Sequence, residues 1–253
     1  MACSPELAAA LEAAEAAARV IRECYAQNLA VRQKEDRTPV TDADLRAEQA
    51  IREVLEARLP GYGFLGEETG RHGGDHALWL VDPIDGTKAF VREYPMFSTQ
   101  IALWRGGALV LGVSSAPLYG ELAWAERGQG AWLNGRRLAV SQVASIEAAA
   151  LSTGNLKSLA AGPGWARFGG VVRRLDRIRG YGDFLHYHLL AAGKIDAVIE
   201  SDVSILDIAA LATIVEEAGG RCTALDGAAL GLGTTSVLAT NGALHEPLLA
   251  ALA

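Results

Sequence analysis

Two aspartates placed three residues apart follow a run of apolar residues in the segment WLVDPIDGTKAF, which covers residues 79–90. Asp82 and Asp85 flank Pro83 and Ile84, although a simple turn needs at most one such acid. Pro83 fixes its own φ and favours an extended conformation at Asp82. Both carboxylates could then point to the same side of the strand end, with the Ile84 carbonyl between them.

The residues that follow this pair are suited to phosphate chemistry. Gly86 lets the backbone approach a ligand closely, and the N–H groups of Gly86 and Thr87 could donate hydrogen bonds to phosphate oxygens. The Thr87 hydroxyl could orient a water molecule. Mg²⁺ prefers oxygen ligands and is usually held by carboxylates together with a substrate phosphate. The segment is therefore typical of a metal-assisted phosphate site.

Four more acids follow an apolar run or begin a predicted helix, namely Asp44, Glu67, Glu68 and Asp207. Each has a simpler interpretation. Asp44 comes three residues after Thr41 and could complete a capping box, and Asp207 could be the acid that a helix N-terminus favours. The two glutamates could form a solvated loop, and the aspartate pair could form a turn. Taken together, six acids in one place would repel, and a pair of divalent cations would remove that repulsion.

The elements that must position these acids fall into two halves, with a boundary near residue 141. In the first half we expect helices over 4–27 and 41–59, followed by five or six short strands of one antiparallel sheet between 77 and 141. In the second half strands alternate with helices, which indicates a layered α/β arrangement. The second half is predicted as strand 148–154, loop 160–170, strand 171–180, helix 183–194, strand 195–201, helix 205–220, a strand and turn over 221–227, strand 236–241 and helix 242–253.

Composition narrows the class of protein. The 253 residues carry a net charge of −7 and no Lys/Arg stripe, which argues against a nucleic-acid partner. Cys3, Cys24 and Cys222 are widely spaced and form no CxxC motif, as expected of reduced thiols in the cytoplasm. Acidic residues interrupt the N-terminal segment where a signal peptide needs an apolar core, and no apolar run is long enough to span a membrane. We therefore expect a cytoplasmic protein without a membrane partner.

Motifs along nearly the whole chain resemble those of the inositol monophosphatase family of metal-dependent phosphatases. Their order and spacing both fit that family. The motifs are PVTDAD at 39–44, GEETG at 66–70, WLVDPIDGTKAF at 79–90, RGQGAWLNGRRLAVS at 127–141 and LDIAALATIVEEAGG at 206–220.

This resemblance implies an α/β fold of the inositol monophosphatase/fructose bisphosphatase type, a five-layer α-β-α-β-α sandwich. Residues 1–141 would supply the N-terminal helices and the antiparallel sheet that carries most metal ligands. Residues 142–253 would supply Asp207 and the substrate contacts. Leu206 stands where the family often has tryptophan, a departure that affects a packing contact and leaves the ligand in place. The resemblance also implies a homodimer.

The resemblance further implies a set of metal ligands. Glu67, Asp82 and the Ile84 carbonyl would hold one Mg²⁺, and Asp82, Asp85 and Asp207 would hold a second. Glu67 would share a weaker third ion, and Mn²⁺ could substitute for Mg²⁺. The family is sensitive to Li⁺, which we expect to act at the second position.

Three residues receive catalytic roles from the same resemblance. Asp44 and Thr87 would form a hydrogen-bonded pair that, with metal held in part by Glu67, activates the attacking water. That water would attack phosphorus in line while the other metal stabilises the leaving alkoxide, without a covalent enzyme intermediate. Gly86 and Thr87 would contact the phosphate group.

The resemblance implies that the substrate is a small phosphorylated metabolite. Residues 179–200, together with Lys88, resemble the histidinol-phosphatase branch, and by position Asp183 and Glu200 would lie at the far end of the substrate. A cationic amino alcohol suits two carboxylates better than a neutral polyol does, which favours histidinol phosphate over myo-inositol monophosphate. Lys88 also occurs in the branch that acts on adenosine 3′,5′-bisphosphate. That substrate and fructose 1,6-bisphosphate are therefore alternatives.

Two non-enzyme interpretations are the alternatives. A catalytically idle relative that binds a metabolite or partner is disfavoured, because all the chemical positions are present. A structural protein with acidic loops would show no saturable Mg²⁺ binding. His186 and His188 flank Tyr187, and on the predicted helix they diverge, so we do not expect them to bind a metal together.

Overall fold

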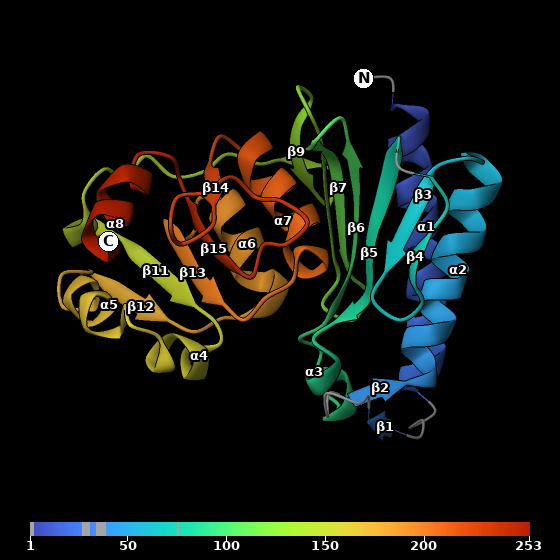
Figure 1. Ribbon diagram of the computed structural model, residues 1–253, viewed down its shortest axis with the longest axis horizontal. Coiled ribbons are helices and arrows are strands. Elements are labelled where there is room, and N and C mark those ends of the chain that lie inside the picture. Colours follow the sequence, from blue (N-terminus) through green and yellow to red (C-terminus); the bar gives the residue numbers. More distant parts are fainter. Residues whose placement is uncertain (1–2, 27–30, 34–38, 75) are drawn as a thin grey trace.

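The computed structural model describes residues 3–26, 31–33, 39–74 and 76–253, with only the backbone described at 31–33 and 39–41. The described elements form five layers (Figure 1). A pair of helices covers an eight-stranded sheet, two central helices follow, and a five-stranded sheet with its own outer helices completes the sandwich. The predicted α-β-α-β-α arrangement is confirmed.

The first layer consists of α1 (Pro5–Tyr25) and α2 (Asp42–Arg58). Ser4 caps α1 by accepting a hydrogen bond from the Leu7 N–H at 3.0 Å, as its position before Pro5 predicts. Alanines dominate the buried face of α1 and let α2 pack closely against it. Both helices were predicted, and α2 ends before Pro60 as expected. The side chain of Thr41 lies outside the described residues, so its capping role stays a prediction.

The large sheet has eight strands in the order β10-β9-β8-β7-β6-β5-β3-β4. It is antiparallel except that β3 runs parallel to β5. The five or six strands predicted between 77 and 141 agree with the six found there, β5 to β10. The sheet also contains β3 and β4, which were not predicted because they are too short to be recognised by alternation. The strands are β3 (Gly63–Gly66), β4 (Gly70–His72), β5 (Ala77–Asp85), β6 (Ser98–Arg105), β7 (Ala108–Ala116), β8 (Glu121–Glu126), β9 (Gly130–Leu133) and β10 (Arg136–Arg137).

The central layer contains α6 (Asp183–Ala191) and α7 (Ile205–Glu217). Helix α7 is apolar around almost its whole circumference, as a helix between two sheets must be. It approaches β7 so closely that a Cβ at Gly112 would lie 2.5 Å from the Ala210 carbonyl oxygen. The second half of the chain therefore packs directly on the sheet of the first half, and the two share one apolar core.

The second sheet has the strand order β12-β11-β13-β15-β14. Strand β11 pairs in parallel with β12 and β13, and the other pairs are antiparallel. The strands are β11 (Ala150–Thr153), β12 (Arg177–Arg179), β13 (Ala197–Ser201), β14 (Arg221–Thr223) and β15 (Ser236–Thr240). The remaining elements are β1 (Val31–Gln33), β2 (Pro39–Thr41), α3 (Thr87–Val91), the 3₁₀ turn η1 (Ile146–Ala148), α4 (Leu156–Ala161), α5 (Trp165–Val172) and α8 (His245–Leu252).

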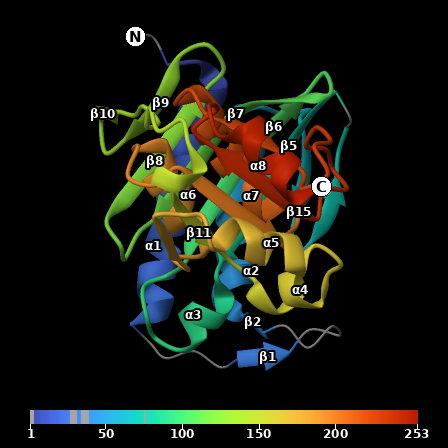
Figure 2. The same cartoon turned by 90° about the vertical axis from the view of Figure 1, so that its left-hand side faces the viewer.

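The outer helical layer corrects two predictions. Residues 160–170 were expected to form a loop and 171–180 a strand, but α5 covers Trp165–Val172 and the strand is limited to Arg177–Arg179. Phe168 and Val171 lie three residues apart and are buried in the apolar cluster beneath α5 and α8. This packing favours the helix despite the glycines in it. Seen from the second half of the chain, α5 and α8 lie in front of the large sheet (Figure 2).

No described helix is both long enough and apolar enough to cross a membrane. The division of the chain near residue 141 stays a prediction.

Candidate active site

Strand β5 ends in an irregularity that presents the two aspartates. Its pairing with β6 is regular as far as Asp82, is interrupted, and resumes at Asp85. Pro83 has no N–H to donate, and its carbonyl accepts the Thr99 hydroxyl at 2.8 Å. The Ile84 N–H turns back to Asp82 Oδ1 at 3.0 Å. The bulge thus fixes the orientation of a buried carboxylate at the end of the strand.

The turn after β5 places a hydroxyl beside α2. Gly86 has φ +91°, and a Cβ there would lie 2.6 Å from the Met96 carbonyl oxygen, so glycine is required. Helix α3 begins at Thr87, whose hydroxyl lies 3.1 Å from the Ile84 carbonyl oxygen and 3.5 Å from Asp44 Oδ1. The predicted Asp44–Thr87 pair is therefore brought together. Because the hydroxyl has one proton, the two acceptors compete for it.

The GEETG loop is held by a residue that sequence reasoning missed. Glu48, buried on α2, accepts the backbone N–H groups of Glu68 and Thr69 at 2.8 and 2.9 Å. It also accepts the Thr69 hydroxyl at 2.5 Å. This network fixes the loop from which Glu67 reaches Asp82. The one available signal was spacing, since Asp44 and Glu48 are four residues apart and share a helix face.

Asp207 joins the site from the second half of the chain. Its carboxylate accepts the Ser204 N–H and the Ser204 hydroxyl, each at 2.8 Å, and completes a capping box at the start of α7. The simpler interpretation of Asp207 as a helix-terminal acid is thus correct. The same carboxylate also lies within electrostatic range of Glu67, Asp82 and Asp85. Asp207 therefore both caps α7 and belongs to the acid cluster.

Burial, together with the neighbouring charges, raises the pKa values of these acids. Burial and then Glu67, Asp85 and Asp207 raise the pKa of Asp82, and Glu67 also hydrogen-bonds to it. Burial and then Asp183 and Asp207 raise the pKa of Asp85. Burial raises the pKa of Asp207 too, although Ser204 opposes the effect. The cluster therefore favours bound protons or a bound cation over several uncompensated charges.

Asp183 belongs to the same cluster. Burial and then the charge of Glu200 raise its pKa to about 6. Asp85, Asp183, Glu200 and Asp207 all line a small cavity of about 50 Å³, together with Asn155 and Tyr187. The structure thus brings the predicted substrate contacts next to two of the predicted metal ligands.

The donor set fits a hard divalent cation, since it consists of carboxylates and one carbonyl oxygen whose mutual repulsion a cation would relieve. Within the described residues, no three Asp, Glu, His or Cys side chains already converge as the ligands of one ion. The fit therefore rests on donor chemistry and crowding.

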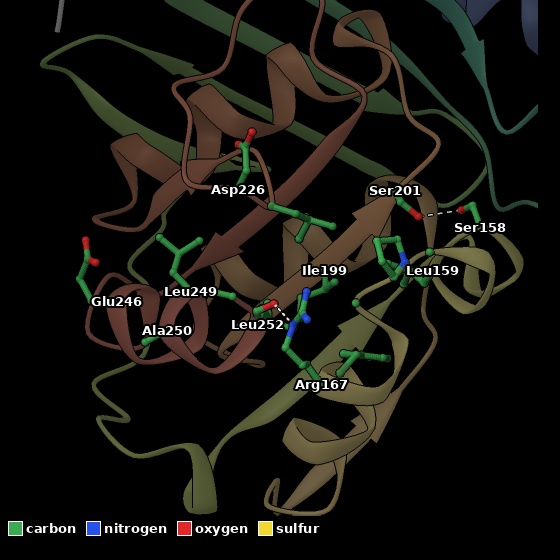
Figure 3. A pocket seen from close by; sticks show the side chains of 16 residues that line it. Ser158, Leu159, Arg167, Ile199, Ser201, Asp226, Glu246, Leu249, Ala250 and Leu252 are labelled. Carbon is green, nitrogen blue, oxygen red and sulfur yellow. Dashed lines mark hydrogen bonds between the residues drawn. The ribbon is translucent and has the colours of Figure 1, made fainter.

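A much larger cavity, of about 710 Å³, lies away from the acids (Figure 3). It opens between α4, α5 and α8, and apolar side chains such as Leu159 and Leu249 line it. Strand β13 separates the two cavities, with Ile199 and Ser201 facing the large one and Glu200 the small one. Chemistry, and not volume, identifies the active site.

The fold and the acid cluster define a class of protein. Carboxylates from both halves meet where β5 ends in a glycine turn suited to phosphate binding, beside a threonine hydroxyl paired with an aspartate. This is the arrangement of a phosphatase that uses metal ions.

Comparison with known proteins identifies the family. The model described as the inositol monophosphatase family matches residues 3–253. The chain is 43% identical to a histidinol-phosphatase of Mycobacterium tuberculosis, covering 96% of each chain. It is 36% identical to an inositol-1-monophosphatase of Caulobacter vibrioides, covering 94% of this chain and 97% of the relative. The extragenic suppressor protein SuhB of Bartonella henselae superposes with a TM-score of 0.90 at 34% identity, covering 98% of both chains.

The chain therefore belongs to the inositol monophosphatase family. It is a phosphomonoesterase that acts on a small phosphorylated substrate, and the family depends on metal ions.

Proposed function

We propose that this phosphatase hydrolyses histidinol phosphate and uses Mg²⁺. The choice of substrate rests on the position of Asp183 and Glu200, which line one cavity with the proposed ligands Asp85 and Asp207. These two carboxylates exceed what phosphate binding needs. The similarity to a protein named histidinol-phosphatase supports the same choice.

Five groups would hold two or three Mg²⁺ ions, or Mn²⁺ in their place. They are the side chains of Glu67, Asp82, Asp85 and Asp207 and the carbonyl of Ile84. When bound, the ions would supply charge neutralisation for the phosphate and acidify water.

The chain's own residues orient the reaction. The Thr87 hydroxyl donates its proton to Asp44 or to the Ile84 carbonyl, so its oxygen lone pairs are available to accept a hydrogen bond from the attacking water. The N–H groups of Gly86 and Thr87 bind a phosphate oxygen. Asp44 is buried at the start of α2 and keeps the Thr87 hydroxyl in place.

The far end of the substrate decides the specificity. A hydrogen bond from an ammonium group to a carboxylate contributes about 1.5–3 kcal/mol, against about 0.5–1.5 kcal/mol for a neutral hydroxyl. Glu200 and Asp183 would therefore favour an amino alcohol phosphate. Myo-inositol monophosphate is the second candidate, because a relative with that named activity is 36% identical. We also propose that the protein is a cytoplasmic homodimer.

Phosphate release from four substrates tests the proposal: histidinol phosphate, inositol 1-phosphate, fructose 1,6-bisphosphate and adenosine 3′,5′-bisphosphate. We expect histidinol phosphate to have the highest kcat/KM. Asp183→Asn should lower kcat/KM for histidinol phosphate by about tenfold or more and should change kcat/KM for inositol 1-phosphate little. Equal losses for both, or a wild type that prefers inositol 1-phosphate, would remove the histidinol phosphate assignment.

A further inference from the structure

Two consecutive residues of α6 contact one oxygen of Glu200. Tyr187 Oη donates to Glu200 Oε2 at 2.7 Å, and His186 Nε2 lies 3.1 Å from the same oxygen. All three side chains are buried. A carboxylate oxygen accepts two hydrogen bonds readily, so these two donors fill the capacity of Oε2.

The other side of the His186 ring is also held. Its Nδ1 lies 3.2 Å from Ser152 Oγ, and that oxygen accepts the Tyr181 N–H at 3.1 Å. Because Ser152 Oγ accepts from the backbone, its own proton is free to go to Nδ1. A His186 ring with a proton on Nε2 then completes one continuous series of hydrogen bonds to Glu200.

Ser152, His186 and Glu200 are the residue types of a nucleophile–base–acid triad, but their geometry excludes that role. Ser152 is a fully buried residue of β11, and its hydroxyl is engaged with both the Tyr181 N–H and the His186 ring. No substrate can reach the Ser152 hydroxyl, so the hydrogen bonds from Ser152 through His186 serve to orient Glu200.

The second oxygen of Glu200 faces the other way. A Cβ built at Gly154 would lie only 1.9 Å from Oε1, so the glycine makes room for this oxygen. No donor among the residues that the structure describes contacts Oε1. Glu200 lines the small cavity with Asp183 and Asp207. One oxygen is thus anchored by α6, and the carboxylate is held ready beside the acid cluster.

We propose that His186 and Tyr187 are positioning residues that fix the carboxylate of Glu200 and thereby set the preference for a phosphate ester whose far end is a protonated amine. This inference rests on the proposed function and deepens it. A carboxylate that is already oriented loses little freedom when it binds an ammonium group, whereas a mobile one would lose more. A neutral hydroxyl gains less from the same orientation.

Three variants test the inference on histidinol phosphate and inositol 1-phosphate. His186→Leu removes one donor to Glu200 and should raise KM for histidinol phosphate about tenfold, with kcat changed by about twofold or less. His186→Gln keeps an N–H donor and should restore most of the loss. Tyr187→Phe is a smaller change that removes the other donor, and it should raise the same KM without unfolding the protein. KM for inositol 1-phosphate should change little in all three.

His188→Leu is the matched control. His188 lies on the same helix and is equally buried, but it contacts Glu121 Oε2 at 2.7 Å and Ser114 Oγ at 3.0 Å instead of Glu200. Any general weakening of α6 should affect this variant as much as His186→Leu, and should change both substrates alike.

The outcomes separate the inference from the proposed function. Wild-type kcat/KM on the two esters decides the substrate. The positioning role is decided by KM for histidinol phosphate, and a wild type that does not hydrolyse this ester removes both the proposed function and the inference. A KM increase in His186→Leu that His186→Gln reverses supports the role, and an unchanged KM, or a loss equal to that of His188→Leu, overturns it.

Discussion

The carboxylate of Glu48 occupies the space where a side chain at residue 66 would lie, because a Cβ at Gly66 would be 2.4 Å from Glu48 Oε2. The glycine of the GEETG loop is therefore needed for contact with α2, in addition to any role beside a ligand. Through this contact the loop that carries Glu67 is fixed to the first helical layer.

We expect Gly66→Ala to destabilise the protein and to weaken Mg²⁺ binding, because the added methyl group displaces Glu48. Glu48→Ala should also destabilise it, by about 1–3 kcal/mol, since two partly buried N–H groups lose their acceptor. The double variant should cost less than the sum, because the space is then free. Chemical unfolding and calorimetric Mg²⁺ titration measure both effects. Glu53→Ala, an exposed change on the same helix, is the control, and strictly additive losses would contradict the contact.

Asp82→Asn should abolish turnover while leaving the fold intact or slightly more stable without metal. The asparagine oxygen keeps the hydrogen bond from the Ile84 N–H, and the change removes one member of a repelling group of acids. Phosphate release at saturating Mg²⁺ and thermal unfolding in a chelator measure the two outcomes. Activity close to that of the wild type would show that Asp82 is not a ligand.

Thr87→Ala should lower kcat by about 100-fold and change KM little, because the hydroxyl orients water and does not hold the substrate. Asp44→Asn should behave in the same way. Since the two side chains lie within 3.5 Å, the losses should be strongly non-additive. Steady-state kinetics of the double variant decides the point: a loss equal to the product of the single losses would show that they act independently.

Without metal, folding stability should rise as the pH is lowered from about 8 to about 5. The pKa of Asp183 is raised from 3.8 to about 6, and those of Asp82 and Asp85 are also raised, so the folded protein holds protons that the unfolded chain has released. Stability is therefore greatest below the unfolded pKa values and is lost as the pH rises through the folded ones. Thermal unfolding in a chelator across this range should show the trend, and saturating Mg²⁺ should reduce it.

Asp183→Asn isolates this effect from other titrating groups. Burial and then the charge of Arg221 lower the pKa of His245 below 6.5, which favours the unfolded chain as the pH falls and opposes the trend. The difference between wild type and Asp183→Asn cancels the contribution of His245. A difference that does not vary with pH would show that Asp183 keeps an ordinary pKa.

Li⁺ should inhibit the enzyme uncompetitively, as the family resemblance implies for the second metal position formed by Asp82, Asp85 and Asp207. Uncompetitive inhibition is expected because Li⁺ would bind after the leaving group departs. Initial rates at several substrate and Li⁺ concentrations test this. Insensitivity at high millimolar Li⁺ would indicate that the second position is altered in this chain.

Much of the site could be predicted because its signals are local. Pro83 and Gly86 fix the backbone around Asp82 and Asp85 through their own φ restrictions, and the pattern of caps and apolar faces predicts α1, α2 and α7. The spacing of the motifs was enough to predict the family and the layered fold.

What the sequence could not determine depends on contacts between distant residues. Glu48 meets the loop at residues 68–69, and His186 meets Glu200 and Ser152, only after sheets and helices have packed. Helix α5 forms against local propensity, because Phe168 and Val171 find an apolar cluster to cover. The sequence by itself determined which acids are available and how the backbone turns near them. Tertiary packing decided which of them share a cavity and which oxygen of Glu200 is anchored, because those relations depend on distances across the fold and not along the chain.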